Sequence, residues 1–140
     1  MTGKKILIVE DESLVAMDLS HTLKRFGYEV VGTAESGPEA VAAVESSAPD
    51  LVLMDILLKG TMDGIEAAGL IRQKSDIPYI YITASTDMET LSRAKETYAY
   101  GYITKPYQDV EVFTAIETAL YKARAERELR ANQAWPWSIL

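Results

Sequence analysis

The chain has 140 residues, of which 48% are hydrophobic and 25% are charged, and it contains no cysteine. A chain of this size buries roughly two-thirds of its unfolded surface, so it needs no covalent staple to hold a core. The lack of cysteine excludes disulfides, thiolate metal sites and a cysteine nucleophile. The formal net charge of −7 argues against direct binding of nucleic acid, because phosphate backbones favour basic surfaces.

The longest apolar runs are too short to cross a bilayer. The first of them, residues 6–9, is followed at once by three acidic residues, an arrangement that a signal peptide would not have. We therefore expect a cytoplasmic protein with no membrane partner.

Short β-branched runs alternate with longer stretches of helical spacing. The strand-like runs are Lys4–Val9, Tyr28–Ala34, Leu51–Met54, Ile77–Thr83 and Tyr100–Ile103. The helical stretches are Ser13–Phe26, Glu39–Val44, Ile65–Ile71 and two that begin near Thr86 and Asp109. Five strands alternating with five helices predict an α/β domain whose helices cover both faces of a parallel sheet. The nearly unbroken runs 6–9 and 51–54 fit central strands that are buried on both sides.

Local signals mark where several helices begin and end. Ser36 and Glu39 form a capping-box pattern with a proline between them, and Thr86 with Glu89 repeats the pattern. Gly27 follows the first helix where a C-terminal cap is expected.

The last helix differs from the others because it has no evident stop. Its apolar residues Phe113, Ile116, Leu120 and Ala123 follow coiled-coil spacing, and residues 124–130 are then highly charged. We expect residues 1–123 to form one domain. Residues 124–140 are expected to be a helical linker that leads into a further domain absent from this chain.

Polar side chains stand at the carboxyl ends of four predicted strands, where parallel α/β sheets bind their ligands. Glu10 and Asp11 follow the first strand, Asp55 the third, Thr83 ends the fourth, and Lys105 follows the fifth. Three carboxylates at one edge raise one another's pKa unless a cation lies between them. Oxygen ligands of this kind suit Mg²⁺.

A carboxylate beside Mg²⁺, an ammonium group and a hydroxyl can attack phosphorus and form an aspartyl phosphate. Asp55 stands alone at the end of a central strand and is the best-placed nucleophile, with Glu10 and Asp11 left to hold the metal. Each residue alone has an ordinary explanation, such as a turn aspartate or an acidic pair at a helix N-terminus. The hypothesis depends on the fact that all of them end different strands of one domain.

Over about residues 4–123 the chain resembles the receiver domain of two-component response regulators, the CheY-like family. The segments that carry the resemblance are Ile6 to Glu12, Asp50 to Asp55, Met62 to Gly64, Ile82 to Ala84 and Gly101 to Pro106. The resemblance implies a doubly wound, flavodoxin-like sheet of five parallel strands in the order 2-1-3-4-5, with five helices. It also implies that Asp55 receives a phosphoryl group from a histidine kinase.

The resemblance further implies a role for each residue around Asp55. Asp11 would bind Mg²⁺ directly, Glu10 would do so through water or at the margin, and Leu57 would supply its backbone carbonyl. Thr83 and Lys105 would each contact a phosphate oxygen.

Tyr102 matches the aromatic position that swings inward when the threonine moves. The surface of the fourth helix, fifth strand and fifth helix would then change and control an output domain.

The sequence departs from the family pattern in three places. The loop 56–64 is one residue longer than usual and lacks the customary proline. Leu57 is apolar at a position whose side chain, in the family, lies near the attacking water. With Ser85 two residues past Thr83, it leads us to predict slower self-dephosphorylation than in receivers with polar residues at both places. Glu10, where the family more often has Asp, is a frequent variant.

Two other function classes remain open on the sequence. A hydrolase of the haloacid-dehalogenase type also uses an Asp nucleophile, but it expects a second Asp where this chain has Leu57. A degenerate receiver would act only as a protein–protein adaptor. We expect a switch that catalyses only its own phosphorylation and dephosphorylation.

Beyond the kinase, we expect two partners: an output domain in cis and a second copy of the chain in a homodimer. Residues 129–140 are similar to the lead-in of PAS-type sensory domains, which would place a diguanylate cyclase or a histidine kinase further along the full protein.

Overall fold

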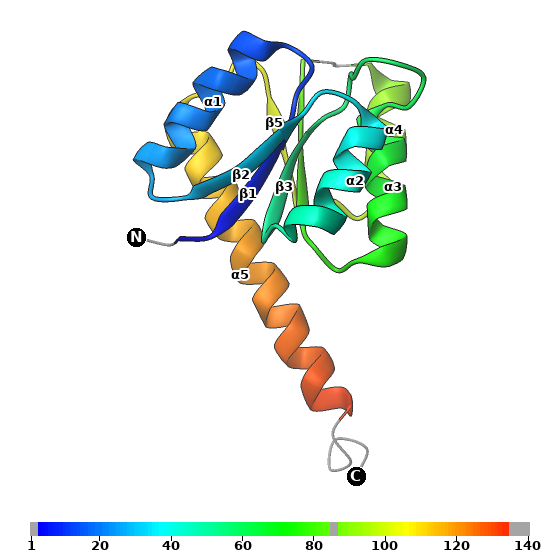
Figure 1. Cartoon of the computed structure of the whole chain (residues 1–140). Helices are drawn as coiled ribbons and strands as arrows, with labels where there is room; N and C mark the ends of the chain where they lie inside the picture. The colour runs from blue at the N-terminus through cyan, green and yellow to red at the C-terminus, as the bar shows by residue number, and fades with distance from the viewer. Residues whose placement is uncertain (1–2, 85–86, 135–140) are drawn as a thin grey trace.

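The computed structural model describes residues 3–84 and 87–134, with side chains described up to residue 131. Its centre is a parallel sheet of five strands in the order β2-β1-β3-β4-β5 (Figure 1). The strands are β1 (Lys5–Val9), β2 (Glu29–Ala34), β3 (Leu51–Asp55), β4 (Tyr79–Thr83) and β5 (Gly101–Thr104). Both the strand order and the fold class predicted from the sequence are confirmed.

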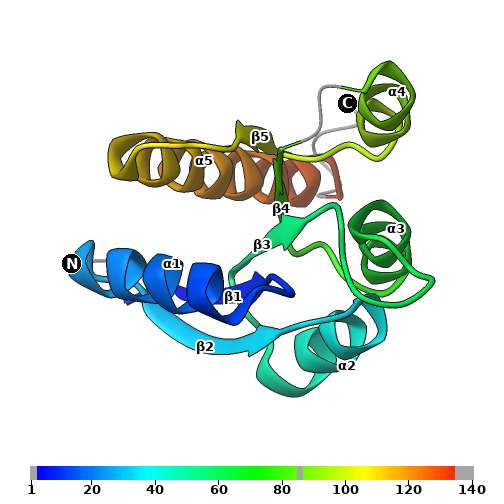
Figure 2. The same ribbon diagram turned by 90° about the horizontal axis from the view of Figure 1, so that it is seen from above.

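Five helices cover the two faces of this sheet. They are α1 (Ser13–Arg25), α2 (Gly37–Ser47), α3 (Gly64–Lys74), α4 (Met88–Lys95) and α5 (Asp109–Ala134). Seen from above, α1 and α5 lie on one side of the strands, and α2, α3 and α4 lie on the other (Figure 2). The chain is therefore wound in both directions from its central strands, as a doubly wound domain requires.

Two apolar cores result, because successive strand residues point to opposite faces. The core under α1 and α5 contains the strand residues Ile6, Ile8, Leu51, Leu53, Ile80 and Ile82. The core under α2 and α3 contains the strand residues Leu7, Val9, Val52, Met54, Tyr79 and Tyr81. Every residue of β3 and β4 is buried, so these strands need apolar side chains on both faces.

The helix caps follow the sequence in part. The Ser36 hydroxyl accepts a hydrogen bond from the Glu39 N–H, as predicted, but the Glu39 carboxylate accepts from Glu35 one residue before the cap. The cap of α4 is Asp87, whose carboxylate accepts from the Thr90 hydroxyl and from backbone N–H groups. The predicted cap Thr86 lies outside the described residues, and its assignment was one residue early. Gly27 has a φ of +91°, so a left-handed glycine follows α1 as expected.

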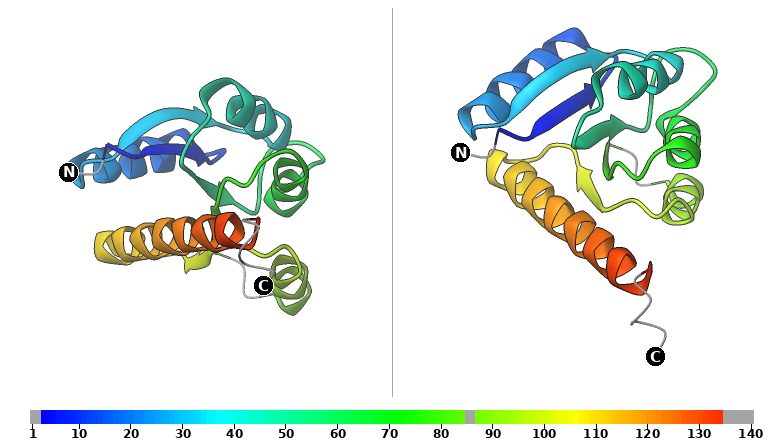
Figure 3. Two further views of the ribbon diagram at one scale, coloured as in Figure 1. Left: turned by 90° about the horizontal axis from the view of Figure 1, so that it is seen from below. Right: turned by 60° about the horizontal axis from the view of Figure 1, so that its bottom comes forward.

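The last helix runs unbroken to Ala134 and projects past the lower edge of the sheet (Figure 3). Its fully buried stripe is Val112, Ile116, Ala119 and Ala123. The predicted residues Phe113 and Leu120 are only half-buried beside it. The predicted division at residue 123 stays a prediction, and the apolar tail 135–140 lies outside the described residues.

None of the described helices combines the length and the apolar character needed to cross a membrane.

Candidate functional site at the carboxyl edge of the sheet

Glu10, Asp55 and Lys105 meet at the upper edge of the sheet. Glu10 directly follows β1, Asp55 is the last residue of β3, and Lys105 directly follows β5. The Lys105 Nζ lies 2.9 Å from Glu10 Oε1 and 2.9 Å from Asp55 Oδ2. Glu10 and Asp55 are only 4% and 5% exposed, so both carboxylates depend on this shared ammonium group.

Backbone groups hold the other oxygen of each carboxylate. The Leu57 N–H donates to Asp55 Oδ1 at 3.1 Å, and the Glu12 N–H donates to Glu10 Oε2 at 3.2 Å. Each carboxylate is therefore fixed at both oxygens, which orients Asp55 before any reaction begins.

The ammonium group of Lys105 is partly desolvated, and this burial alone would lower its pKa. Hydrogen bonds to Glu10 and Asp55, together with their negative charges, outweigh the burial and raise the pKa of Lys105. Lys105 therefore remains a cation at neutral pH.

Asp11 completes an acidic cluster with Glu10 and Asp55. One carboxylate oxygen from each of the three residues lies within 4.8 Å of the others. With Lys105 counted, the four side chains carry a formal charge of −2, which one divalent cation would balance. Hard carboxylate oxygens at a partly exposed rim are the ligand set that Mg²⁺ prefers, so the residues present fit this ion.

The other predicted site residues lie close by in the fold. Thr83 is the last residue of β4, is 3% exposed, and its carbonyl accepts from the Lys105 N–H at 2.9 Å. Lys105 precedes a cis peptide bond to Pro106. Leu57 lies just after Asp55 with a side chain that is 61% exposed.

Tyr102 in β5 is half-exposed rather than inserted beside Thr83. Its hydroxyl donates to the carbonyl of Ala94 in α4 at 3.2 Å, and its ring lies 5.9 Å from that of Tyr81. The sequence placed Tyr102 on β5 correctly but did not reveal this bond to α4.

Two neighbours of the site have roles that sequence reasoning missed. Gly64, the first residue of α3, lies so close to the end of β3 that an added Cβ would overlap the Asp55 carbonyl oxygen. Asp63 caps α3 and also forms an ion pair with Arg93 of α4 at 2.9 Å. Both belong to the segment Met62 to Gly64, whose motif was visible in the sequence although its contacts were not.

The chain matches the model of the response regulator receiver domain over residues 6–117. Transcriptional regulatory protein PdtaR of Mycobacterium tuberculosis is 40% identical over 131 residues, which are 94% of this chain and 63% of that protein. The chain thus spans less than two-thirds of this curated relative.

Solved receiver domains have the same fold. One is the signal receiver domain of a modulated diguanylate cyclase from Desulfovibrio desulfuricans G20, with a TM-score of 0.84 and 39% identity over 88% of this chain and 98% of that one. Another is the N-terminal domain of a response regulator/sensory box/GGDEF 3-domain protein from Carboxydothermus hydrogenoformans. It has a TM-score of 0.81 and 38% identity, with the same coverage of both chains. These matches favour a receiver over a dehalogenase-type hydrolase, and the chain belongs to the response regulator receiver domain family.

Proposed function

We propose that Asp55 accepts a phosphoryl group from a histidine kinase and that the resulting aspartyl phosphate switches the surface of α4, β5 and α5. The observation that carries this proposal is the meeting of three carboxylates and the Lys105 ammonium around a pre-oriented Asp55. Receiver domains are signalling switches rather than classical enzymes. The only chemistry proposed here is self-directed.

The transfer is an in-line displacement at phosphorus. An oxygen of Asp55 forms the new P–O bond while the P–N bond of the donor phosphohistidine breaks, and its electron pair stays on the imidazole nitrogen. Attack by water on the same phosphorus later releases inorganic phosphate and restores the carboxylate.

Each residue of the rim has a role in this reaction. Glu10 and Asp11 would hold Mg²⁺, and Asp55 and the Leu57 carbonyl would complete its protein ligands. A bound ion would supply positive charge to offset the charge on the transferring oxygens. Lys105, already 2.9 Å from Asp55, pairs with a phosphate oxygen.

Thr83 and Tyr102 carry the signal outward. A phosphoryl group adds charge and acceptor oxygens that draw the Thr83 hydroxyl inward, and this leaves room for the Tyr102 ring. The hydroxyl of Tyr102 must then release the Ala94 carbonyl, so α4 loses one of its bonds to the sheet. The phosphate biases an existing equilibrium between two arrangements.

The proposed output is a domain in cis. The named neighbours include a receiver in a protein with a sensory box and a GGDEF domain, which supports a sensory domain and a diguanylate cyclase as the output. PdtaR supports transcriptional control as the second candidate. We propose a receiver at residues 1–123 and a linker at 124–140, which is helical as far as Ala134. We also propose that the protein is cytoplasmic and forms a homodimer.

Intact-mass spectrometry after incubation with acetyl phosphate and Mg²⁺ tests the proposal. We expect one phosphoryl adduct that is lost with EDTA and in Asp55→Asn. Asp18→Asn, which changes an exposed acid on α1, is the matched control and should keep the adduct. If no adduct forms even with a competent kinase as donor, the protein is an adaptor and the proposal is wrong.

A further inference from the structure

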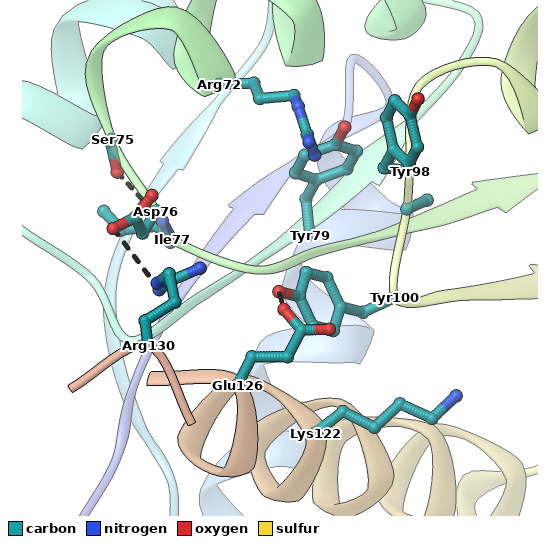
Figure 4. A pocket seen from close by; sticks show the side chains of 11 residues that line it. Arg72, Ser75, Asp76, Ile77, Tyr79, Tyr98, Tyr100, Lys122, Glu126 and Arg130 are labelled. Atoms are coloured by element: carbon teal, nitrogen blue, oxygen red, sulfur yellow. Dashed lines mark hydrogen bonds and ion pairs between the residues drawn. The ribbon is translucent and has the colours of Figure 1, made fainter. Parts of the chain in front are cut away.

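The part of α5 that projects beyond the sheet is held by polar contacts. All side chains from residue 124 to 131 are exposed. Two of them nevertheless reach the body of the domain (Figure 4). Glu126 accepts a hydrogen bond from the Tyr100 hydroxyl at 2.5 Å, and Arg130 lies 3.5 Å from Asp76.

A cavity of about 480 Å³ separates this part of α5 from the sheet. Its walls are the C-terminal end of α3, the start of β4, the connection between α4 and β5, and one side of α5 (Figure 4). Ile77, Ala99 and three tyrosines line the cavity together with charged side chains. The two polar pairs join residues 124–131 of α5 to the body of the domain across this space.

Tyr100 belongs to a short connection that is bonded to the end of α4. The hydroxyls of Tyr79 and Tyr81 both bond to Thr97, and the Thr97 hydroxyl bonds to the Ala94 carbonyl at 2.7 Å. Three residues after Thr97, the N–H of Tyr100 donates to the Tyr79 carbonyl at 2.9 Å. A shift of the α4 end therefore reaches Tyr100 through bonded neighbours.

The same connection contains an unusual backbone conformation. Tyr98 has a φ of +60°, a backbone conformation that is common for glycine but rare for residues with large side chains. The Arg72 guanidinium lies over the Tyr98 ring, 4.3 Å from its centre. Surrounding contacts must hold a residue in such a conformation, so the backbone between α4 and Tyr100 is well defined.

The Tyr100 hydroxyl stays protonated and donates its hydrogen bond to Glu126. Burial, followed by the hydrogen bond and the negative charge of Glu126, raises the pKa of Tyr100 to about 12. The phenol thus keeps its proton at neutral pH and the bond to the carboxylate is charge-assisted.

We propose that the pairs Tyr100–Glu126 and Asp76–Arg130 form a latch that docks residues 124–131 of α5 on the lower edge of the sheet. The latch opens when the connection after α4 shifts. The docking is a property of the described chain alone. Only its opening by phosphorylation rests on the function proposed for Asp55.

Hydrogen–deuterium exchange read by mass spectrometry tests the docking. In Tyr100→Phe the ring remains but the bond to Glu126 is lost, so the amides of residues 124–131 should exchange about fivefold faster. Tyr121→Phe removes an exposed hydroxyl from the same helix and should leave this exchange unchanged. Exchange in α1 serves as the folding control.

A second variant protects the test against local misfolding. Asp76→Ala removes the acceptor of the other pair at an exposed position and should loosen the same amides. If both variants exchange like the wild type while α1 keeps its protection, the latch does not hold the helix and the proposal is wrong.

The coupling between phosphorylation of Asp55 and opening of the latch is tested separately. After treatment with acetyl phosphate and Mg²⁺, with the adduct verified by mass, residues 124–131 should exchange faster in the wild type but no faster in Tyr100→Phe. An adduct with unchanged exchange would overturn the coupling. Failure to form the adduct would count against the role of Asp55, while the variants would still decide the docking.

Discussion

Replacement of Gly64 by alanine tests how the end of β3 is positioned. A Cβ at residue 64 would lie 2.9 Å from the Ile56 Cα and 3.0 Å from the Asp55 carbonyl carbon, and it would overlap the carbonyl oxygen of Asp55. Ordinary contacts begin at 3.4 Å, so even the mildest of these is about 0.4 Å too short. All three atoms belong to the backbone and cannot rotate away.

The backbone at the start of α3 or at Asp55 must therefore move. Overpacking of this kind costs about 3 kcal/mol, which lowers the Tm of a domain this size by roughly 10 °C. A shift of even part of an ångström at Asp55 also disturbs its orientation, so we expect the rate of phosphorylation by acetyl phosphate to fall at least about tenfold.

Gly69→Ala provides the matched control on the same helix. A Cβ there meets nothing within 4 Å, so the alanine should raise stability by about 0.5–1 kcal/mol through helix propensity and leave phosphorylation unchanged. Thermal unfolding and intact-mass kinetics of the two variants give the comparison. A Gly64→Ala protein with the Tm and the phosphorylation rate of the wild type would refute the reasoning.

Three further predictions concern the site and the tyrosines. Asp11→Asn removes the charge of one of three clustered carboxylates, so it should stabilise the metal-free protein by about 0.5–1 kcal/mol in urea unfolding with EDTA. The same variant should lose the stabilisation that Mg²⁺ gives the wild type. Destabilisation in EDTA would contradict this prediction. Leu57→Asn should shorten the half-life of the phosphorylated protein several-fold, and an unchanged half-life would show that this side chain does not control access of water. Burial raises the pKa values of Tyr28, Tyr81 and Tyr100 above 10, and the carboxylate partners of Tyr28 and Tyr100 raise theirs further. Below pH 10 both states keep these protons, whereas at higher pH the unfolded chain ionises first. The free energy of unfolding should therefore fall from pH 10 to pH 12, less steeply in Tyr100→Phe, and a flat profile in urea unfolding would be the contrary result.

The sheet and its acidic edge were predictable because strand ends in a parallel sheet meet at one side. The alternation of strands and helices placed Glu10, Asp55 and Lys105 at that side without any knowledge of distances. The strand order came from the resemblance to receivers and not from periodicity, since any order of five buried strands gives a similar apolar pattern.

Contacts between distant segments were beyond the sequence pattern. Strand propensity accounts for tyrosines in β4. It could not reveal that the hydroxyls of Tyr79 and Tyr81 reach Thr97 on a later connection. In α5 the predicted stripe was displaced toward Phe113 and Leu120, because helical spacing allows neighbouring stripes and the sheet decides which one is buried. The closeness of Gly64 to Asp55 depends on the path of the loop 56–63.

The way in which α4 is attached has a consequence for its local stability. Ala94 is the only buried residue of this eight-residue helix. The hydrogen bonds of Tyr102 and Thr97 and the ion pair of Arg93 supply much of its attachment. A segment that buries so little apolar surface unfolds locally at a small fraction of the free energy of global unfolding, so α4 should be among the first elements to open in the native protein. A change of only a few kcal/mol in the free-energy difference between two positions of α4 is then enough to turn the less populated position into the more populated one.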